Sequence, residues 1–249
     1  MMQDDTLQLL STGKIASLGL LPWSSNYTFL VKVTAVNQFD EAGEPIETMA
    51  VYKPQKGEAP LWDFAEGSLC MRELASYLVS SSLGWNLVPP TVLRNGPHGL
   101  GSMQLFIDND PNNHFFTFRE NPEIADELQR LVVFDLITNN ADRKSGHCLL
   151  GNDGHLWAID HGITFNVDHK LRTVIWDFAN QPLPFAIIED LQRLRQEIDH
   201  VDADLMVMLT ELLTSAEIKA FKRRLDGLIH LGHFPSPSRG QRSMPWPPV

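Results

Sequence analysis

Two acidic motifs flank a short predicted β-hairpin near the middle of the chain. Asp142 begins the sequence DRKSGH, and Asp160 lies in IDHG, 18 positions later. Between them, CLLG and LWAID have the composition of short strands around an Asn152-Asp153-Gly154 turn. Because a hairpin returns the chain to where it started, we expect the two carboxylates at one cleft. This constrains the fold more than any other feature, since the other segments must be arranged around that cleft.

The sequence pattern changes at about residue 108. Before it, apolar and alternating segments predict strands over 14–21, 27–36, 48–53, 91–94 and 102–107, with one helix over 68–83. After it, Asn121-Pro122 begins a helix that runs to about Thr138, and helical spacing of apolar residues recurs over 186–231. We therefore predict an α+β fold with an N-terminal lobe (1–107), a C-terminal lobe (108–234) and a Pro/Ser-rich tail (235–249). The tail is expected to be extended or mobile, with the alternative that Trp246 pins it to the body or to a second subunit. Trp62, Trp157 and Trp176 are expected in the core.

Composition excludes several functional classes. The chain has 249 residues and a formal net charge of −11, which argues against general binding to nucleic acids or anionic membranes. The sequence has no apolar run of about 18 residues that would span a membrane, and its acidic beginning is unlike a secretory signal. Cys70 and Cys148 form neither a disulfide framework nor a zinc pattern. We expect a reduced, cytoplasmic setting.

Lys53 and Glu73 precede the acidic motifs in an informative order. Lys53 ends the apolar strand AVYKP, and Glu73 lies within the next helix, in MRELASYL. Taken singly, each could be a solvated surface residue. A strand lysine followed by a helix glutamate is the ion pair that positions nucleotide phosphates in kinases. Asp142 and Asp160 would add the oxygen ligands that magnesium or manganese needs beside such phosphates.

Together these motifs resemble the phosphatidylinositol 3- and 4-kinase superfamily, in a small bacterial form. The family's catalytic loop reads D-R-H-x-x-N and its metal motif reads I-D-F-G or I-D-N-G, where this chain has DRKSGH and IDHG. VYKP (51–54), GSMQLFI (101–107) and LVVFDLITNNAD (131–142) resemble the segments around the nucleotide lysine, the hinge and the catalytic aspartate. The resemblance covers roughly residues 20–180 and implies a bilobal, protein-kinase-like fold.

The resemblance also implies roles for individual residues. Lys53 would hold the α- and β-phosphates of ATP, and Glu73 would orient Lys53. Asp142 would orient the attacking hydroxyl or accept its proton, and Asp160 would bind the Mg²⁺ or Mn²⁺ ion. The phosphate-facing loop would be Ser24, Ser25 and Asn26, and the adenine pocket would be lined by Gln104, Leu105, Phe106 and Ile107.

One position departs from the family pattern. His147 stands where the family has a second metal-binding Asn. It is either a metal ligand, which would favour Mn²⁺ or another transition metal over Mg²⁺, or a sign of weak nucleotide binding or of a pseudokinase. His161, after the metal aspartate, is expected to be structural. Asp135 is expected to accept hydrogen bonds from the catalytic loop.

The predicted function is ATP-dependent transfer of the γ-phosphate to a hydroxyl acceptor. Alternatives are a protein Ser/Thr kinase, an AMP-transferase and a nucleotide-binding pseudokinase that acts as a regulator. His169, Lys170 and Arg172 could receive an anionic acceptor or form an ordinary solvated loop. The resemblance suggests a lipid acceptor, but the net charge and the lack of a basic amphipathic helix argue against binding to a membrane surface. Lipid, protein and small-molecule acceptors therefore all remain open.

Overall fold

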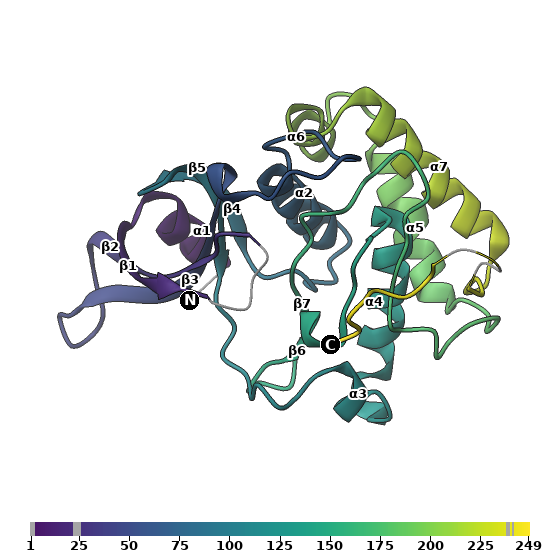
Figure 1. Cartoon of the computed structure of the whole chain (residues 1–249), viewed down its shortest axis with the longest axis horizontal. Coiled ribbons are helices and arrows are strands. Elements are labelled where there is room, and N and C mark those ends of the chain that lie inside the picture. Colours follow the sequence, from purple (N-terminus) through teal and green to yellow (C-terminus); the bar gives the residue numbers. More distant parts are fainter. Residues whose placement is uncertain (1–2, 22–25, 238–239, 241) are drawn as a thin grey trace.

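The computed structural model describes residues 3–21, 26–237, 240 and 242–249. Its first half is built on one antiparallel sheet of five strands in the order β1-β2-β3-β5-β4 (Figure 1). The bounds are β1 (Lys14–Leu20), β2 (Phe29–Phe39), β3 (Pro45–Pro54), β4 (Thr91–Gly96) and β5 (Gly99–Leu105). Helix α2 (Leu69–Ser82) follows β3 after the 3-10 turn η1 (Gln55–Gly57) and leads to β4.

The second half is mainly helical around a short hairpin. Its elements are α3 (Phe115–Phe118), η2 (Pro122–Ile124), α4 (Ala125–Thr138), η3 (Ser145–His147), β6 (Cys148–Leu150), β7 (Leu156–Ala158), α5 (Phe185–Glu197), α6 (Asp204–Leu212) and α7 (Ser215–Leu231). Strands β6 and β7 pair antiparallel, with Leu149 opposite Trp157. The α+β class and the hairpin between the two acidic motifs are therefore as predicted. The boundaries at 107–108 and 234–235 stay a prediction.

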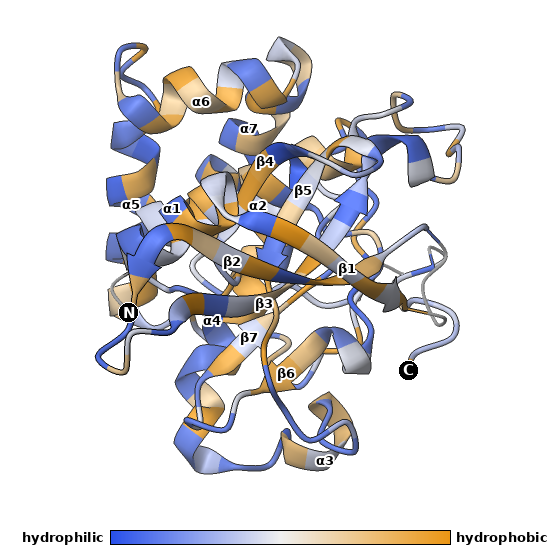
Figure 2. Ribbon diagram, turned by 90° about the vertical axis from the view of Figure 1, so that its left-hand side faces the viewer, coloured by the Kyte–Doolittle hydropathy of each residue, from blue (hydrophilic) through white to orange (hydrophobic). Residues whose placement is uncertain are grey.

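Buried and exposed side chains alternate along the strands of the sheet, because only one face of the sheet is covered. In β2, Val31 and Val33 are buried whereas Lys32 and Thr34 are partly exposed. Figure 2 shows this pattern as orange and blue segments along the strand. Helix α1 (Gln3–Thr12) covers the sheet with Leu9 and Leu10. The sheet thus has its own small core, made of Leu9, Leu10, Val31, Val33, Ala50, Tyr52 and Met103.

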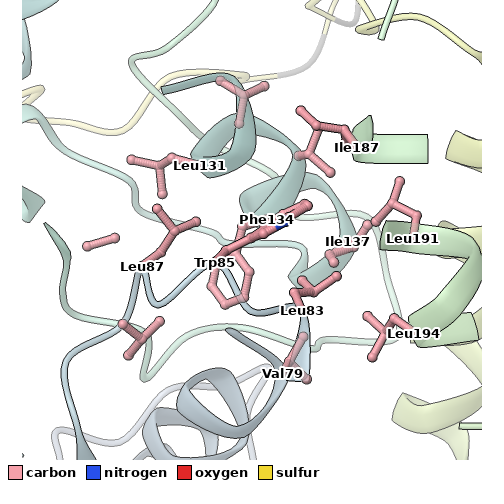
Figure 3. Packing of buried hydrophobic residues seen from close by; sticks show 14 of the residues in the cluster. Val79, Leu83, Trp85, Leu87, Leu131, Phe134, Ile137, Ile187, Leu191 and Leu194 are labelled. Carbon is pink, nitrogen blue, oxygen red and sulfur yellow. The ribbon is translucent and has the colours of Figure 1, made fainter. Parts of the chain in front are cut away.

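A larger core fills the space between α2, α4, α5 and α7. Val79 and Leu83 of α2 point toward Leu131, Phe134 and Ile137 of α4, and Ile187, Leu191 and Leu194 of α5 close the cluster from the other side (Figure 3). This apolar core holds α2 and α4 together, and each of these helices carries or precedes residues of the predicted site.

The expectation for the tryptophans is wrong, and three further features go beyond the predicted plan. Trp62 is 90% exposed rather than part of the core, and Trp157 and Trp176 are only partly buried. Helix α1 has no counterpart among the predicted elements. The helical stretch 186–231 is three helices, with non-helical residues around 199–203 and 213–214. The C-terminal segment is not detached: Pro245 is buried, and the carbonyls of Ser243 and Pro248 accept backbone hydrogen bonds from the body of the protein.

None of the helices in the described part of the chain is both long enough and apolar enough to cross a lipid bilayer.

Candidate active site

Strand β3 places Lys53 where the sheet meets the second half of the molecule. Lys53 pairs with Ser102 of β5, and the neighbouring pair is Pro54 with Gly101. A Cβ atom on Gly101 would lie 2.4 Å from the carbonyl oxygen of Lys53, so only glycine allows β5 to approach β3 this closely. The Lys53 ammonium forms ion pairs with Glu73 Oε1 and, at 2.9 Å, with Asp160 Oδ1. Burial alone would lower the pKa of Lys53, but the carboxylates of Asp160 and Glu73 raise it above its ordinary value.

Glu73 points inward from α2, as the predicted ion pair requires. Its side chain is nearly buried, and its second oxygen accepts a hydrogen bond of 3.0 Å from the His161 backbone N–H. One carboxylate therefore joins β3, α2 and the turn after β7. Since both oxygens have partners, the cost of burying the charge is offset.

The loop over residues 142–147 is held by Arg143, which is fully buried. Its guanidinium forms hydrogen bonds with both carboxylate oxygens of Asp135, with His161 Nε2 at 2.7 Å, and with the carbonyls of His147 and Ile159. Asp135 is 1% exposed and also accepts a bond from the Asn140 amide. Asp135 and His161 thus lie in the structural positions that the sequence analysis expected of them.

His147 turns its Nε2 atom toward Asp160. The two side chains lie 3.4 Å apart, measured from Nε2 to Oδ2. Burial lowers the pKa of His147 to about 4, so the ring is neutral near pH 7. Its Nδ1 lies 3.0 Å from the Asp142 carbonyl oxygen, which can only accept, and 3.5 Å from the Lys144 backbone N–H, which can only donate. The shorter contact places the ring proton on Nδ1. That leaves a lone pair on Nε2 beside the Asp160 carboxylate.

Asp160 follows β7 in an unusual backbone conformation. Its φ is +62°, in the left-handed region where Asp and Asn are the commonest non-glycine residues. The Lys53 ammonium, and further the neighbouring His147, hold the pKa of Asp160 well below its ordinary value. Asp142 differs, since burial raises the pKa of its carboxyl above the ordinary value. Asp142 is therefore the more basic of the two carboxylates, while Asp160 stays charged.

These residues line one cleft of about 380 Å³. Its lining comes from the segment 26–28, from β3 and the loop after it, from α2 and from residues 142–163, and it includes Lys53, Glu73, Asp142, His147 and Asp160. The structure thus brings together the lysine, the glutamate and both aspartates, which are spread over more than 100 positions of the sequence.

The predicted nucleotide loop is only partly placed. Ser24 and Ser25 lie outside the described residues. Asn26 lines the cleft, and its Oδ1 accepts a hydrogen bond of 2.7 Å from the Ala59 N–H. Asn26 therefore fixes the loop after η1 and faces the cleft at the same time.

The predicted adenine residues 104–107 lie outside the lining of this cleft. Gln104 is buried, and its side chain donates to Thr91 Oγ1. The backbone N–H groups of Leu105 and Phe106 donate to the carbonyls of Pro90 and Met49. Phe106 itself is 38% exposed. The adenine role of Gln104, Leu105, Phe106 and Ile107 stays a prediction, with the Leu105 and Phe106 N–H groups already engaged within the protein.

Two cleft residues were missed by the sequence analysis. Lys144 lines the cleft and lies 3.4 Å from Asp142 Oδ2, which puts a cation beside the candidate base. Glu58 accepts hydrogen bonds from the Leu69 and Cys70 N–H groups at the start of α2. Lys144 had a signal, its place in the DRKSGH motif. No sequence signal indicated Glu58, because its place in the cleft depends on how the loop over 58–67 folds back onto the start of α2.

The side chains of Asp160 and His147 could bind a divalent ion together with phosphate oxygens. A carboxylate from Asp160 and an imidazole nitrogen from His147 face the same space. The carboxylate suits Mg²⁺ and Mn²⁺ alike, whereas the imidazole favours Mn²⁺ or another transition metal over Mg²⁺. Within the described residues, no group of three or more His, Cys, Asp or Glu side chains is arranged to hold a metal. The remaining ligands would have to come from phosphate or water.

Known proteins are similar in sequence to this chain, over nearly all of it or over a part. A family model described as phosphatidylinositol 3- and 4-kinase matches residues 93–216. Protein Rv2133c of Mycobacterium tuberculosis is 37% identical, over 99% of this chain and 96% of its own. Phosphatidylinositol 4-kinase gamma 4 of Oryza sativa subsp. japonica is 32% identical over 47% of this chain, which spans 24% of that kinase. Phosphatidylinositol 4-kinase gamma 3 of Arabidopsis thaliana is 27% identical, over 61% of this chain and 33% of its own.

Solved structures show the same fold at low sequence identity. The Golgi casein kinase with Mn/ADP bound has a TM-score of 0.55 and 16% identity, over 92% of this chain and 75% of its own. Hydra Fam20 with sugar has a TM-score of 0.55 and 13% identity, over 89% and 85%. These structures confirm the bilobal, protein-kinase-like fold, and the family match supports a kinase-like phosphotransferase. The chain is therefore a phosphatidylinositol 3- and 4-kinase-like protein with a kinase fold.

Proposed function

We propose that this protein transfers the γ-phosphate of ATP to a hydroxyl acceptor with the help of a divalent ion. One observation carries the proposal: Lys53 lies between Glu73 and Asp160 in a cleft that also contains Asp142, Lys144 and His147. Phosphoryl transfer depends on positioning and on neutralising charge, and this set of side chains supplies both.

Each side chain has a role that its surroundings suit. Lys53 holds phosphate oxygens, and Glu73 keeps its ammonium in place. Asp142 faces the acceptor hydroxyl, and its raised pKa makes it the better proton acceptor of the two aspartates. Lys144, beside Asp142, is placed to meet the charge that develops on the transferred phosphoryl group.

Asp160 and His147 would hold the divalent ion, which supplies charge neutralisation for the phosphates when it is bound. The structurally similar Golgi casein kinase was solved with Mn/ADP, which supports manganese as the first ion to try. We expect His147→Ala to change the preference between Mn²⁺ and Mg²⁺ in nucleotide binding. An unchanged preference would show that His147 is not a ligand.

Nucleotide binding and turnover test the proposal directly. Thermal shift and ATP turnover are measured with Mn²⁺ and with Mg²⁺, for the native chain and for Lys53→Met, Asp142→Asn and Asp160→Asn. Lys53→Met and Asp160→Asn should abolish the metal-dependent shift, whereas Asp142→Asn should keep the shift and lose turnover. Glu189→Gln, an exposed position on α5, is the control and should behave as the native chain does. No shift with either ion would refute phosphoryl transfer from ATP, AMP transfer and a nucleotide-binding regulatory role alike.

The acceptor and the transferred group need separate experiments. Phosphatidylinositol vesicles, casein and myo-inositol are offered as lipid, protein and small-molecule acceptors, with labelled ATP as the donor. Intact mass after incubation with ATP distinguishes addition of phosphate from addition of AMP to the protein itself. Nucleotide binding without turnover on any acceptor, water included, would favour a pseudokinase.

A further inference from the structure

The C-terminal segment 242–249 lies beside the candidate active site. In Figure 1 the yellow C-terminal end lies in the second half of the molecule, and its Pro248 is hydrogen-bonded to Ser145 of η3. The Ser145 N–H donates to the Pro248 carbonyl at 2.9 Å, and the Thr173 N–H donates to the Ser243 carbonyl at 3.0 Å. The segment therefore spans two loops that are remote from it in sequence.

Both donors belong to the framework of the 142–147 loop. Ser145 is within that loop and is fully buried. Thr173 is 2% exposed and forms a parallel bridge with Arg143, the residue after Asp142. Without the segment, two buried N–H groups beside Asp142 would lose their partners, which costs more than an exposed hydrogen bond would.

The segment supports this loop without covering the cleft. The described lining of the cleft falls between Asn26 and Ile163. Pro245 is buried against the protein, whereas Trp246 is 77% exposed and Met244 is 44% exposed. A segment that blocked the site would place side chains in the cleft. This one contributes the Pro248 carbonyl to Ser145 of the loop and the Ser243 carbonyl to Thr173, and its Pro245 side chain is buried.

We propose that residues 242–249 are a positioning element of the 142–147 loop, which hold Asp142 in place through Ser145 and through the Thr173–Arg143 bridge. Lys53 and Glu73 pair with each other outside this loop, whereas His147 is part of it and lies 3.4 Å from Asp160. Release of the segment should therefore disturb Asp142 most and the metal-dependent part of nucleotide binding less. The effect on turnover rests on the proposed function, whereas the effect on the loop does not.

Hydrogen exchange tests the structural part without any substrate. Pro245→Asp puts a charge at the buried position and should release the segment. The Ser145 and Thr173 amides should then exchange about tenfold faster or more, because each loses its acceptor. Trp246→Ala, at the exposed neighbour, should leave both rates unchanged, and the amides of β3 should be unaffected in either variant. Native protection of Ser145 and Thr173 in Pro245→Asp would overturn the proposal.

Kinetics test the consequence for turnover, with ATP hydrolysis in the presence of Mn²⁺ as the assay. Deleting residues 242–249 should lower kcat about tenfold and change KM for ATP by a smaller factor, because the loss of one or two buried hydrogen bonds falls on the loop that carries Asp142 and His147, while Lys53 and Glu73 stay in place. Pro245→Ala, which keeps the buried apolar contact, should retain most of kcat. An unchanged or raised kcat after the deletion would overturn the positioning role. If the native chain transfers phosphate from ATP to none of the acceptors, water included, the proposed function fails, and hydrogen exchange still decides whether the segment holds the loop.

Discussion

Lys53 and Asp160 form an ion pair in the cleft, but the segments that carry them are stabilised in different ways. The sheet around Lys53 rests on a small apolar core and leaves Leu18, Leu20, Val36 and Phe39 exposed. The loops around Asp142 and Asp160 rest on a buried polar network, in which Asp135, Asn139, Asn140, Arg143 and His161 are at most 1% exposed. Apolar contacts tolerate a change of residue far better than a buried charge tolerates the loss of its partner. This difference explains why one side of the cleft carries recognisable sequence motifs and the other carries mainly an alternating pattern.

The largest effect is expected from Asp135→Ala. It would leave the fully buried Arg143 guanidinium without its carboxylate, which costs about 3–5 kcal/mol of unfolding free energy. Urea unfolding followed by circular dichroism measures the change. The matched control lies on the sheet side, where Glu47 forms an exposed ion pair with Lys32. Glu47→Ala should leave the unfolding free energy unchanged within error. Comparable losses of unfolding free energy in Asp135→Ala and Glu47→Ala would contradict the proposed difference between the polar network and the sheet.

Truncating one leucine in each core sharpens the same comparison. Leu131 on α4 and Leu10 on α1 are both fully buried, so Leu131→Ala and Leu10→Ala remove the same atoms. Each should cost about 2–5 kcal/mol, with Leu131→Ala toward the upper end because the larger core cannot collapse around the cavity. Hydrogen exchange should show that Leu10→Ala loosens β1 and β2 first. If both variants lost the same unfolding free energy, and hydrogen exchange rose over the whole chain in each, the two cores would unfold as one unit.

The network around Arg143 also predicts a response to pH. Burial, and further the neighbouring Arg143 guanidinium, hold the pKa of His161 well below its ordinary value, and burial lowers the pKa of His147 to about 4. The folded protein thus binds fewer protons than the unfolded chain below about pH 6.5, so stability is lost as the pH falls from there toward 4. Melting temperatures across this range measure the loss. His161→Asn keeps an acceptor for Arg143 but cannot be protonated, so the melting temperature of this variant should fall less between pH 6.5 and 4 than that of the native chain. Identical pH profiles would exclude His161 as a source of the loss.

The smallest effect is expected from Trp62→Ala. Trp62 is 90% exposed and stacks on the Lys170 ammonium, with 4.6 Å between the nitrogen and the ring centroid. Such an exposed cation–π contact contributes about 0.5–1 kcal/mol. Trp85→Ala is the contrast, because Trp85 is 4% exposed in the large core and donates to Asp190, and its loss should cost about 3–5 kcal/mol. A loss above about 2 kcal/mol for Trp62→Ala would show that it does more than cover Lys170.

The parts of the fold that sequence could predict are those with local signals. The hairpin between Asp142 and Asp160, the turn residues around it and the alternation in β2 and β3 are written in neighbouring residues, and all are observed. The Lys53–Glu73 pair follows from the order of the elements and from the resemblance to a family. The structure places Arg143, Asp135 and His161 in one buried network, of which the sequence indicated only the acceptor role of Asp135 and the structural role of His161.

The parts that escaped prediction depend on contacts between remote residues. Helix α1 is short and packs on the sheet through Leu9 and Leu10, with Arg94 of β4 donating to the Leu10 and Gly13 carbonyls. Trp62 looks like a core residue by composition, and only the fold of the loop over 58–67 exposes it. The C-terminal segment has the composition of a free tail, and its attachment rests on backbone carbonyls, which no side-chain pattern reveals.

The left-handed backbone at Asp160 limits how this position can change in evolution. Apart from glycine, Asp and Asn are among the few residues that adopt a φ of +62° at low cost, and of these three only Asp carries a charge. A descendant that lost its activity could therefore keep its shape by a single-base drift from Asp to Asn or Gly. Among relatives that preserve the hairpin, an Asn or a Gly at this position would mark the lineages that kept the fold after losing metal-dependent nucleotide binding.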